Sequence, residues 1–432
     1  MLQVDRFWAI GPSARIHLPT AIAGTGAPGR LVPLRLGRCS LGDLPPEPSI
    51  IHLPEPLTAP RGAPLVTATH RDGSAVVLAA RRGDGDVELA FHPDRAVRAL
   101  AAEASPVGRR PAAARLPFNY RRVPRVVRTA LRDLMARRRA DALEDFPAWP
   151  VEPSVEILRR IYLLARRALE PGLEPAPFWP ERRRFALVLT HDVDSAEGLA
   201  LAPELAREEQ ERGLSSCWFL VGRDYELAEE AIGSLRDAGG ELALHDVHHD
   251  NRGAFLAPAA IARRLDSVRQ EVERFGMRGF RSPSMLVSEP LYDALEERFA
   301  WDSSVADSAL LPVRGGGGTV FPSERGRLTV LPLTLPADGQ LVGRGMPPER
   351  VLAAWIAKAE WVRSVGGTAM ILTHPERGFT ADAGMRAAHR SFLDWAAGQA
   401  DAWRVLPTQL ADHWRARAAG AAAGPSLAQH SS

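Results

Sequence analysis

The sequence is poor in cysteine and has no long hydrophobic run. Its 432 residues include two cysteines, Cys39 and Cys217, which form no CxxC pair. A disulfide framework and a cysteine-based zinc site are therefore excluded. No stretch of about 18 apolar residues is present, which argues against a transmembrane segment. The first residues also lack the basic segment and apolar run of a secretory signal. We therefore expect a cytoplasmic protein.

Neither sign of charge is in excess. The 54 basic and 52 acidic residues leave a net charge of +2, too small to attract nucleic acid or a membrane by overall charge. With 45% hydrophobic and 25% charged residues, the composition is that of a globular protein. A chain of 432 residues exceeds the length of one ordinary domain, so we expect more than one.

Residues 1–115 contain short apolar runs interrupted by proline and glycine. Segments 31–36 and 74–80 are typical of strands, and the turn after the second, with Gly83 and Gly85, predicts a β-hairpin. No catalytic group of residues is recognisable there. The sequence predicts a small, strand-rich α+β region of unknown function.

Residues 116–184 are predicted to form a helical connector and a linker. Segment 121–139 is arginine-rich with apolar residues at helical spacing, which fits a solvated helix face or, less simply, an anionic docking surface. A second helix is expected over 154–169 with Ser154 as its N-cap. The proline-rich stretch 170–184 is typical of an extended linker.

Residues 185–415 alternate between apolar runs and charged, periodic stretches. The apolar runs lie at 186–190, 217–221, 241–245, 279–282 and 369–373. This alternation predicts parallel βα units and an α/β fold. Residues 416–432 are of low complexity, and we expect a disordered tail.

The first chemical motif is FALVLTHDVDS, in which a buried-looking strand leads into Asp192 and Asp194. Residues two apart on an extended chain point to one side, so one carboxylate could bind a metal while the other faces a substrate. Active sites of βα barrels lie at such strand ends. Capping of the following helix is the alternative interpretation.

The second motif, GGELALHDVHHD, places His245, His248 and His249 after another apolar strand. His245 and His249 are four residues apart, and in a helical turn both imidazoles would share one face and one cation. Two imidazoles and one carboxylate form an open catalytic metal site. An exposed histidine-rich loop is the alternative, and His248 is expected to be merely exposed.

Two further apolar runs deliver Arg281 and His374. Arg281 could orient a carboxylate and keep it ionised through paired hydrogen bonds. His374 could donate a proton to a leaving group. Segment 331–341 is expected to line the cleft with Asp338 as a candidate substrate contact, although an ordinary strand and turn explains it equally well.

The order of these motifs over residues 184 to about 415 resembles the polysaccharide deacetylases, the NodB-homology proteins of carbohydrate esterase family four. THDVD looks like a variant of their first motif with the two acids separated by one residue. The resemblance implies a distorted (β/α)7-type barrel over residues 185–415. It assigns Asp192 as general base and Asp194, His245 and His249 as metal ligands, with Asp246 where the family has serine, threonine or glycine.

The resemblance also assigns the remaining site residues. Arg281 and Pro283 match the arginine and proline motif, so Arg281 would orient the base, and the backbone N–H of Ser284 would bind the oxyanion. Leu372 and His374 match the last motif, which makes His374 the general acid. Ser284 stands where the family often has an aromatic residue, so a sugar platform is not implied there.

The implied activity is removal of an acyl group, in this family an acetyl group, from an amino sugar that is free, lipid-linked or polymeric. One divalent metal, zinc or else cobalt, nickel or iron, would activate the attacking water. Two alternatives remain open. One is a hydrolase of another non-peptide C–N bond on the same metal site; the other is a non-catalytic carbohydrate-binding module of a polysaccharide assembly system.

Overall fold

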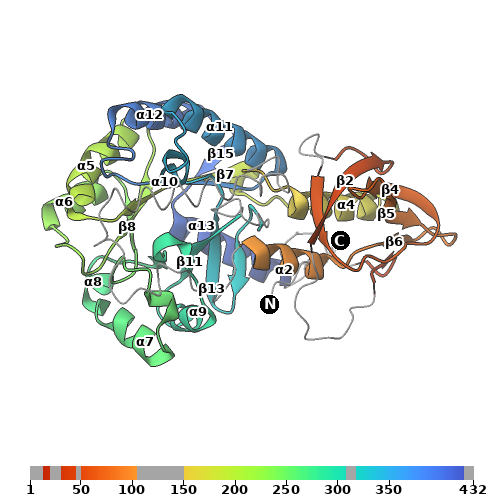
Figure 1. Cartoon of the computed structure of the whole chain (residues 1–432), viewed down its shortest axis with the longest axis horizontal. Helices are drawn as coiled ribbons and strands as arrows, with labels where there is room; N and C mark the ends of the chain where they lie inside the picture. The colour runs from red at the N-terminus through yellow and green to blue at the C-terminus, as the bar shows by residue number, and fades with distance from the viewer. Residues whose placement is uncertain (1–12, 20–30, 45–49, 105–149, 308–317, 423–432) are drawn as a thin grey trace, which may run out of the picture.

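The computed structural model describes residues 13–19, 31–44, 50–104, 150–307 and 318–422. The predicted helix at 121–139 and the last part of the predicted disordered tail, 423–432, lie outside these residues. The prediction is wrong for the first part of that tail, because 416–422 continue the helix α13 (Pro407–Ala422). Figure 1 shows two β-sheets at opposite ends of the long axis, a smaller one formed by residues 16–89 and a larger one surrounded by helices. The predicted strand-rich region and the predicted α/β region thus correspond to separate sheets.

The smaller sheet has six strands in the order β1-β6-β5-β4-β2-β3. They are β1 (Ile16–His17), β2 (Leu31–Cys39), β3 (Ile50–Pro54), β4 (Ala63–Thr69), β5 (Ala75–Arg81) and β6 (Val87–Leu89). Neighbours are antiparallel except β1 and β6. The predicted hairpin is the pair β5 and β6, and Gly85 takes the positive φ of +88° at its turn.

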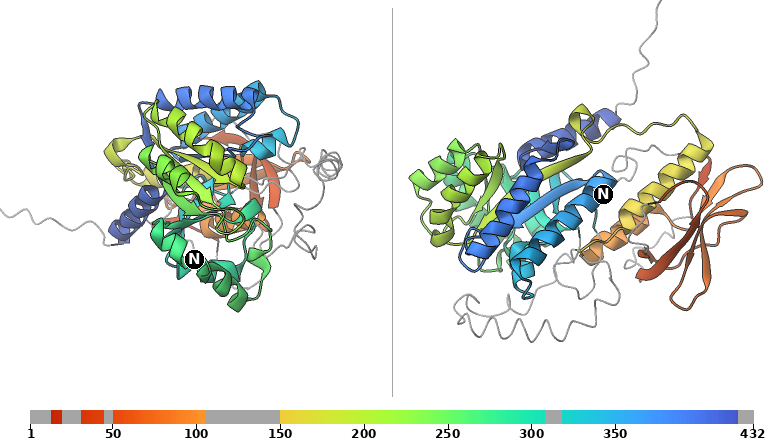
Figure 2. Two further views of the ribbon diagram at one scale, coloured as in Figure 1. Left: turned by 90° about the vertical axis from the view of Figure 1, so that its left-hand side faces the viewer. Right: turned by 90° about the horizontal axis from the view of Figure 1, so that it is seen from above.

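Two helices, α2 (Pro93–Ala104) and α4 (Ser154–Leu169), pack together and against β3. Figure 2 shows α4 running along the smaller sheet. The helix predicted over 154–169 is confirmed, but the N-cap prediction is wrong. Ser154 is already helical, and its Oγ accepts the backbone N–H of His52 at 2.7 Å and bonds Glu152. Because Ser154 is buried beside β3, its hydroxyl bonds the backbone of that strand and not the free N–H groups of the first helical turn.

Helix α4 also contacts the part of the chain that carries the larger sheet. Its buried Glu156 accepts hydrogen bonds from the Thr319 hydroxyl at 3.1 Å and the Val320 N–H at 3.2 Å. The Lys358 ammonium donates to the Pro150 carbonyl at 2.8 Å. One hydrophobic core extends across both regions, so α4 joins the two sheets by packing as well as by chain connection.

Replacing Glu156 with glutamine is expected to stabilise the protein above neutral pH. Burial raises the pKa of Glu156 from 4.5 to about 7, so the folded state holds this proton more tightly than the unfolded chain. The parent therefore loses stability as pH rises from about 4.5 to about 7. The variant should gain on the order of 2–3 kcal/mol at pH 8 and almost nothing at pH 4, measured by urea unfolding at both values.

The matched control for this prediction is Glu170→Gln, because Glu170 ends the same helix with a side chain that is 45% exposed. Its effect on stability should be small at both pH values. An equal effect of Glu156→Gln at pH 4 and pH 8 would contradict the prediction.

The larger sheet has nine strands, with the order β12-β13-β11-β10-β9-β8-β7-β14 and β15 paired to β7. All pairs are parallel except β12 with β13. The strands are β7 (Phe185–Val193), β8 (Ser216–Leu220), β9 (Glu241–Leu244), β10 (Gly279–Phe280), β11 (Trp301–Ala306), β12 (Ser323–Arg325), β13 (Leu328–Leu333), β14 (Thr368–Thr373) and β15 (Ala402–Arg404). The parallel strands that the sequence predicted are confirmed.

Helices cover this sheet in Figure 1, as expected for strands whose apolar runs are buried on both faces. They are α5 (Ala196–Gln210), α6 (Glu229–Asp237), α7 (Pro258–Asp266), α8 (Arg269–Arg274), α9 (Glu289–Glu296), α10 (Asp338–Val342), α11 (Pro348–Val365), α12 (Ala383–Ala397) and α13 (Pro407–Ala422), with the short 3-10 turns η4 (Pro180–Arg182), η5 (Gly253–Phe255) and η6 (Pro283–Met285). None of the helices in the described ranges has both the length and the apolar composition that a membrane crossing requires.

The sheet curves so that β13 and β14 approach each other. Just beyond β13, the N–H groups of Thr334 and Leu335 donate to the Met370 carbonyl of β14 at 3.3 and 2.9 Å. The fold is therefore a curved, mostly parallel α/β sheet, in agreement with the predicted class. Its curvature brings the carboxyl ends of the parallel strands toward a common centre.

Candidate metal and catalytic site

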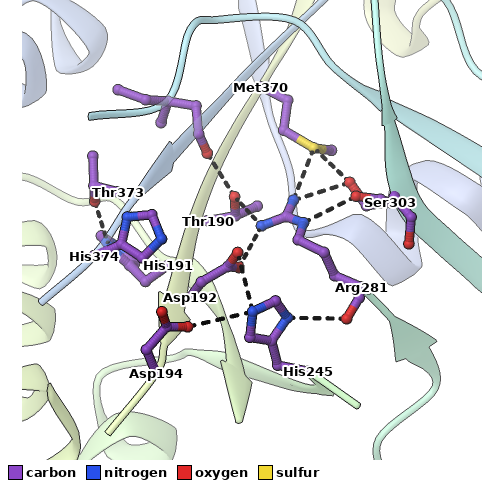
Figure 3. Close-up of polar contacts among 12 residues, drawn as sticks. Thr190, His191, Asp192, Asp194, His245, Arg281, Ser303, Met370, Thr373 and His374 are labelled. Atoms are coloured by element: carbon purple, nitrogen blue, oxygen red, sulfur yellow. Dashed lines mark hydrogen bonds and ion pairs between the residues drawn. The ribbon is translucent and has the colours of Figure 1, made fainter. Parts of the chain in front are cut away.

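Five of the predicted site residues come together at the carboxyl ends of the parallel strands (Figure 3). Asp192 and Asp194 lie at the end of β7, His245 follows β9, Arg281 follows β10 and His374 follows β14. These strands lie in one part of the sheet, in the order β10-β9-β8-β7-β14, so residues up to 182 positions apart in the chain share one edge. The convergence that the sequence could only suggest is present in the structure.

Three side chains are arranged as a metal-binding group. One ligand atom each from Asp194, His245 and His249 lies within 4.8 Å of the others. Asp194 Oδ1 is 3.4 Å from His245 Nε2, and Asp194 Oδ2 is 3.2 Å from His249 Nε2. These separations exceed the usual N–H···O distance of about 2.9 Å. Each imidazole faces a different oxygen of Asp194, so a carboxylate that binds through either or both oxygens can share one cation with the two imidazoles.

The protonation of His245 suits a ligand. Its Nδ1 lies 2.9 Å from the Arg281 carbonyl, and a carbonyl can only accept, so Nδ1 carries a proton and Nε2 is the nitrogen that presents a lone pair when the imidazole is neutral and binds a metal. A backbone carbonyl in this position is a common support for metal-binding imidazoles. The donor set of two imidazoles and one carboxylate therefore fits zinc or a related divalent cation and leaves room for a water.

The sequence predicted that the two histidines share a helical turn, and this prediction is wrong. Residues 245–252 form an irregular turn between β9 and η5, and Asp246 adopts φ +59°. The imidazoles nevertheless converge, with ring centroids 5.2 Å apart. His248 lies on the outside of this turn, where Nδ1 is 2.7 Å from Asp224 Oδ1, and Asp224 Oδ2 accepts the His249 N–H at 2.8 Å.

Asp192 is not one of these three ligands but faces the same centre. Its Oδ2 is 3.5 Å from His245 Nε2, and its Oδ1 accepts from Arg281 Nη1 at 2.8 Å. Burial alone would raise the pKa of Asp192, but the charges of His245, Arg281 and His374 outweigh burial and hold this pKa below 3.8. The carboxylate is therefore ionised and can accept a proton.

Arg281 is fully buried and satisfied by several partners. Nε donates to the Ser303 carbonyl at 3.0 Å, Nη2 to the Ser303 hydroxyl at 2.9 Å, and Nη1 to the Thr190 hydroxyl at 3.0 Å as well as to Asp192. The guanidinium lies over the Phe219 ring, 3.9 Å from its centroid. These contacts hold the guanidinium in one orientation. They therefore fix the position of Nη1, which donates to Asp192, and with it the direction of the Asp192 carboxylate.

His374 is paired with Asp338. His374 Nδ1 lies 2.6 Å from Asp338 Oδ1, and the His374 N–H donates to Asp338 Oδ2 at 2.8 Å. Burial alone would lower the pKa of His374, but the charge of Asp338 and this hydrogen bond raise it to about 10. His374 is therefore a cation that can donate a proton from Nε2.

Asp338 was predicted to contact the substrate, but the structure places it elsewhere. It is fully buried, and its two oxygens accept hydrogen bonds from Gly339, Thr380 and His374. Packing of α10 against β14 places the carboxylate behind His374. Asp338 therefore orients and charges His374, and has no free oxygen for a substrate.

Pro283 and Ser284 belong to the turn η6, which begins two residues after Arg281. Ser284 is exposed and adopts a left-handed backbone with φ +54°, and its hydroxyl donates to Asn251 Oδ1 at 3.1 Å. Within the described residues, the Ser284 N–H has no hydrogen-bond acceptor. This N–H is thus available to a ligand, which is compatible with the predicted oxyanion contact.

Glu376 also belongs to the site, although the sequence argument did not identify it. Its Oε1 accepts the Asp194 N–H at 2.8 Å and the Ser195 hydroxyl at 3.1 Å. A side chain at Gly198 would collide with this carboxyl group, so Gly198 allows it to approach. Glu376 lies two residues after His374, in the segment LTHPE that follows β14. Its place in this motif was the sequence signal from which a role at the site could have been predicted.

Buried His191, Glu209 and His389 also bring three potential ligand atoms within 4.8 Å. Here, however, His191 Nε2 is 2.7 Å from Glu209 Oε1 and His191 Nδ1 is 2.8 Å from the Thr373 hydroxyl, which are hydrogen-bond distances. His191 follows Thr190 on β7 and points away from Asp192. We interpret this group as a polar cluster that supports β7 and β14 from behind.

The comparison with known proteins is limited to fold. No protein-family model and no curated protein matches the chain. A solved structure described as a polysaccharide deacetylase from Mycobacterium smegmatis has 22% identity and a TM-score of 0.48, covering 55% of this chain and 93% of that one.

Two other solved structures give similar values. One described as a polysaccharide deacetylase from Pseudomonas aeruginosa PAO1 has 15% identity and a TM-score of 0.47, covering 57% of this chain and 95% of that one. The allantoinase Puue has 13% identity, a TM-score of 0.47 and the same coverages. Identities and scores this low do not assign an activity to the chain.

Proposed function

We propose that the protein is a metal-dependent hydrolase of the polysaccharide deacetylase kind, which removes an acyl group, in the first place an N-acetyl group, from an amino sugar or a polysaccharide precursor. One observation carries the proposal: a three-ligand metal group, an ionised carboxylate held by a buried arginine, and a cationic histidine share one edge of the sheet. In this proposal the curved sheet is the distorted (β/α)7-type barrel of that family, and THDVD is its first motif.

Asp194, His245 and His249 would hold the metal, with zinc the best candidate for this donor set. When bound, the metal supplies Lewis acidity to the attacking water and to the scissile carbonyl. Asp192 then takes the proton of the water, because Arg281 occupies its Oδ1 and leaves Oδ2 directed at the same centre. Arg281 keeps this base ionised and correctly oriented.

The other residues act on the oxygen and nitrogen of the amide. The Ser284 N–H donates to the developing oxyanion. His374 donates its Nε2 proton to the nitrogen, since an amine is a poor leaving group until it is protonated. Asp338 keeps that proton on His374 until it is needed. The products are a free amine and a carboxylic acid, which is acetic acid for an N-acetyl substrate.

The proposal is tested by measuring acetate release from a panel of acetylated amino sugars and chito-oligosaccharides with zinc-loaded or cobalt-loaded full-length protein. Release from any member supports deacetylation. Turnover of a cyclic amide without acetate release would favour another C–N hydrolase on the same site. Sugar binding without any turnover would favour the non-catalytic module. The cytoplasmic location is a separate prediction that this experiment does not test.

Replacing Asp338 with asparagine is expected to shift the alkaline limb of kcat to lower pH. Asp338 raises the pKa of His374 to about 10, so the parent retains its general acid up to that pH. Without the carboxylate, burial lowers the pKa of His374, and the limb should move down by at least about two pH units. The measurement is kcat for amide substrate between pH 6 and pH 10.5.

The control is Thr380→Val, which removes only a neutral hydrogen-bond donor from Asp338 Oδ2, at 3.0 Å in the parent. It should leave the alkaline limb within about half a pH unit. An alkaline limb that stays near the parent value in Asp338→Asn would show that His374 is not the acid.

A further inference from the structure

The turn that carries the two histidine ligands has little regular structure of its own. Residues 245–251 are neither helix nor strand, and Asp246 and Asn251 adopt φ of +59° and +60°. Non-glycine residues rarely take this left-handed conformation, and it persists where the surroundings impose it. The direction of the imidazoles must therefore be set by contacts from outside the turn.

Arg264 of α7 supplies five of these contacts. Its Nε donates to Asp246 Oδ1 at 3.0 Å and its Nη2 to Asp246 Oδ2 at 2.9 Å, a paired geometry. The same guanidinium donates to both oxygens of Asp250 at 3.0 Å and to the His248 carbonyl at 2.7 Å. One side chain thus binds the turn at three points between His245 and Asn251.

The Asp246 carboxylate is confined as well as paired. It accepts the Val247 N–H at 2.6 Å, and a side chain at Gly253 would collide with it. The Arg264 and Asp246 side chains are only 11% and 5% exposed. Removal of either one leaves a buried charge without its main counterion, which the turn can relieve only by changing conformation.

We propose that Arg264 and Asp246 are positioning residues that hold the His245 and His249 imidazoles toward Asp194. The proposal rests on the metal site of the proposed function. Asp246 stands where the deacetylase pattern has a small residue, and here its ion pair with a helix of the surrounding layer supports the ligand turn. Neither residue touches the reacting atoms.

Cobalt(II) binding to the full-length protein tests this inference. Affinity is measured by competition with a chromophoric chelator, and visible absorption of the bound cobalt reports the ligand geometry. Arg264→Ala should weaken cobalt binding by about 10–100-fold, the range found for supporting residues around metal ligands, and alter the absorption. Arg264→Lys keeps the charge without the paired bonds, so a smaller loss is expected.

The matched control is Arg278→Ala, which breaks a paired Arg–Asp contact of the same length, 2.9 and 3.0 Å to Asp412, on the exposed surface. It should leave cobalt affinity and absorption unchanged. Asp246→Ser completes a double-mutant cycle with Arg264→Ala. The double variant should lose much less affinity than the product of the two single losses, because both changes remove the same contact.

Parent-like cobalt affinity and absorption in folded Arg264→Ala protein would overturn the positioning role and leave the proposed function intact. A parent that binds no cobalt would overturn both. If Arg264→Ala does not fold, Arg264→Lys and Asp246→Ser decide the question by the same two measurements, and parent-like values in both overturn it.

Discussion

Asp192→Asn is expected to lower kcat by about 10²–10⁴-fold while about one divalent metal per chain is retained. Asparagine keeps the Oδ1 acceptor that receives the Arg281 Nη1 hydrogen bond at 2.8 Å, so the local structure should survive. It cannot take a proton, and Asp192 is not among the three grouped ligands. Turnover is measured as acetate release and metal content by elemental analysis.

The control for this variant is Asp412→Asn, which makes the same substitution at an exposed residue paired with Arg278. Both its turnover and its metal content should equal those of the parent. Full activity of Asp192→Asn would exclude it as the base, and loss of metal from that variant would make Asp192 a ligand instead.

The second large effect is expected when His245 and His249 are both replaced with alanine. Metal content should fall from about one to less than about 0.1 per chain, and turnover should fall to background, because a single carboxylate cannot retain the ion. The 3.4 and 3.2 Å separations of these imidazoles from Asp194 are the structural basis of this expectation. Elemental analysis after dialysis provides the measurement.

His248→Ala is the control from the same turn. Its imidazole pairs with Asp224 on the outside and is 46% exposed, so metal content should stay near that of the parent. Equal metal content in the parent and in the His245 and His249 double variant would place the ion elsewhere. A parent that cannot be loaded with zinc or cobalt would favour the non-catalytic alternative.

Much of the larger sheet could be predicted from the sequence because its signals are local. Continuous apolar runs such as 186–190 and 369–373 can be buried on both faces only as inner strands of a covered sheet, and β7 and β14 are confirmed there. The hairpin with Gly85 was predictable for the same reason, since one residue supplies the required positive φ.

The predictions that were wrong or missing depend on partners distant in the chain. Ser154 has the side chain of an N-cap, but a backbone N–H 102 positions away takes its hydroxyl. Asp338 lies 36 positions before His374, and only the packing of α10 shows that it is buried behind that residue. Local sequence cannot reveal either contact.

The sequence by itself determined which donor and acceptor atoms are present and that each follows a buried strand, because residue type and apolar periodicity are local properties. Only the tertiary structure decided how these atoms are arranged and charged. The curved sheet brings Asp194, His245 and His249 within one coordination distance, and buried partners fix the direction of Asp192 and the charge of His374. Distance, burial and local dielectric set these properties, and all three arise only when the distant parts of the chain are packed together.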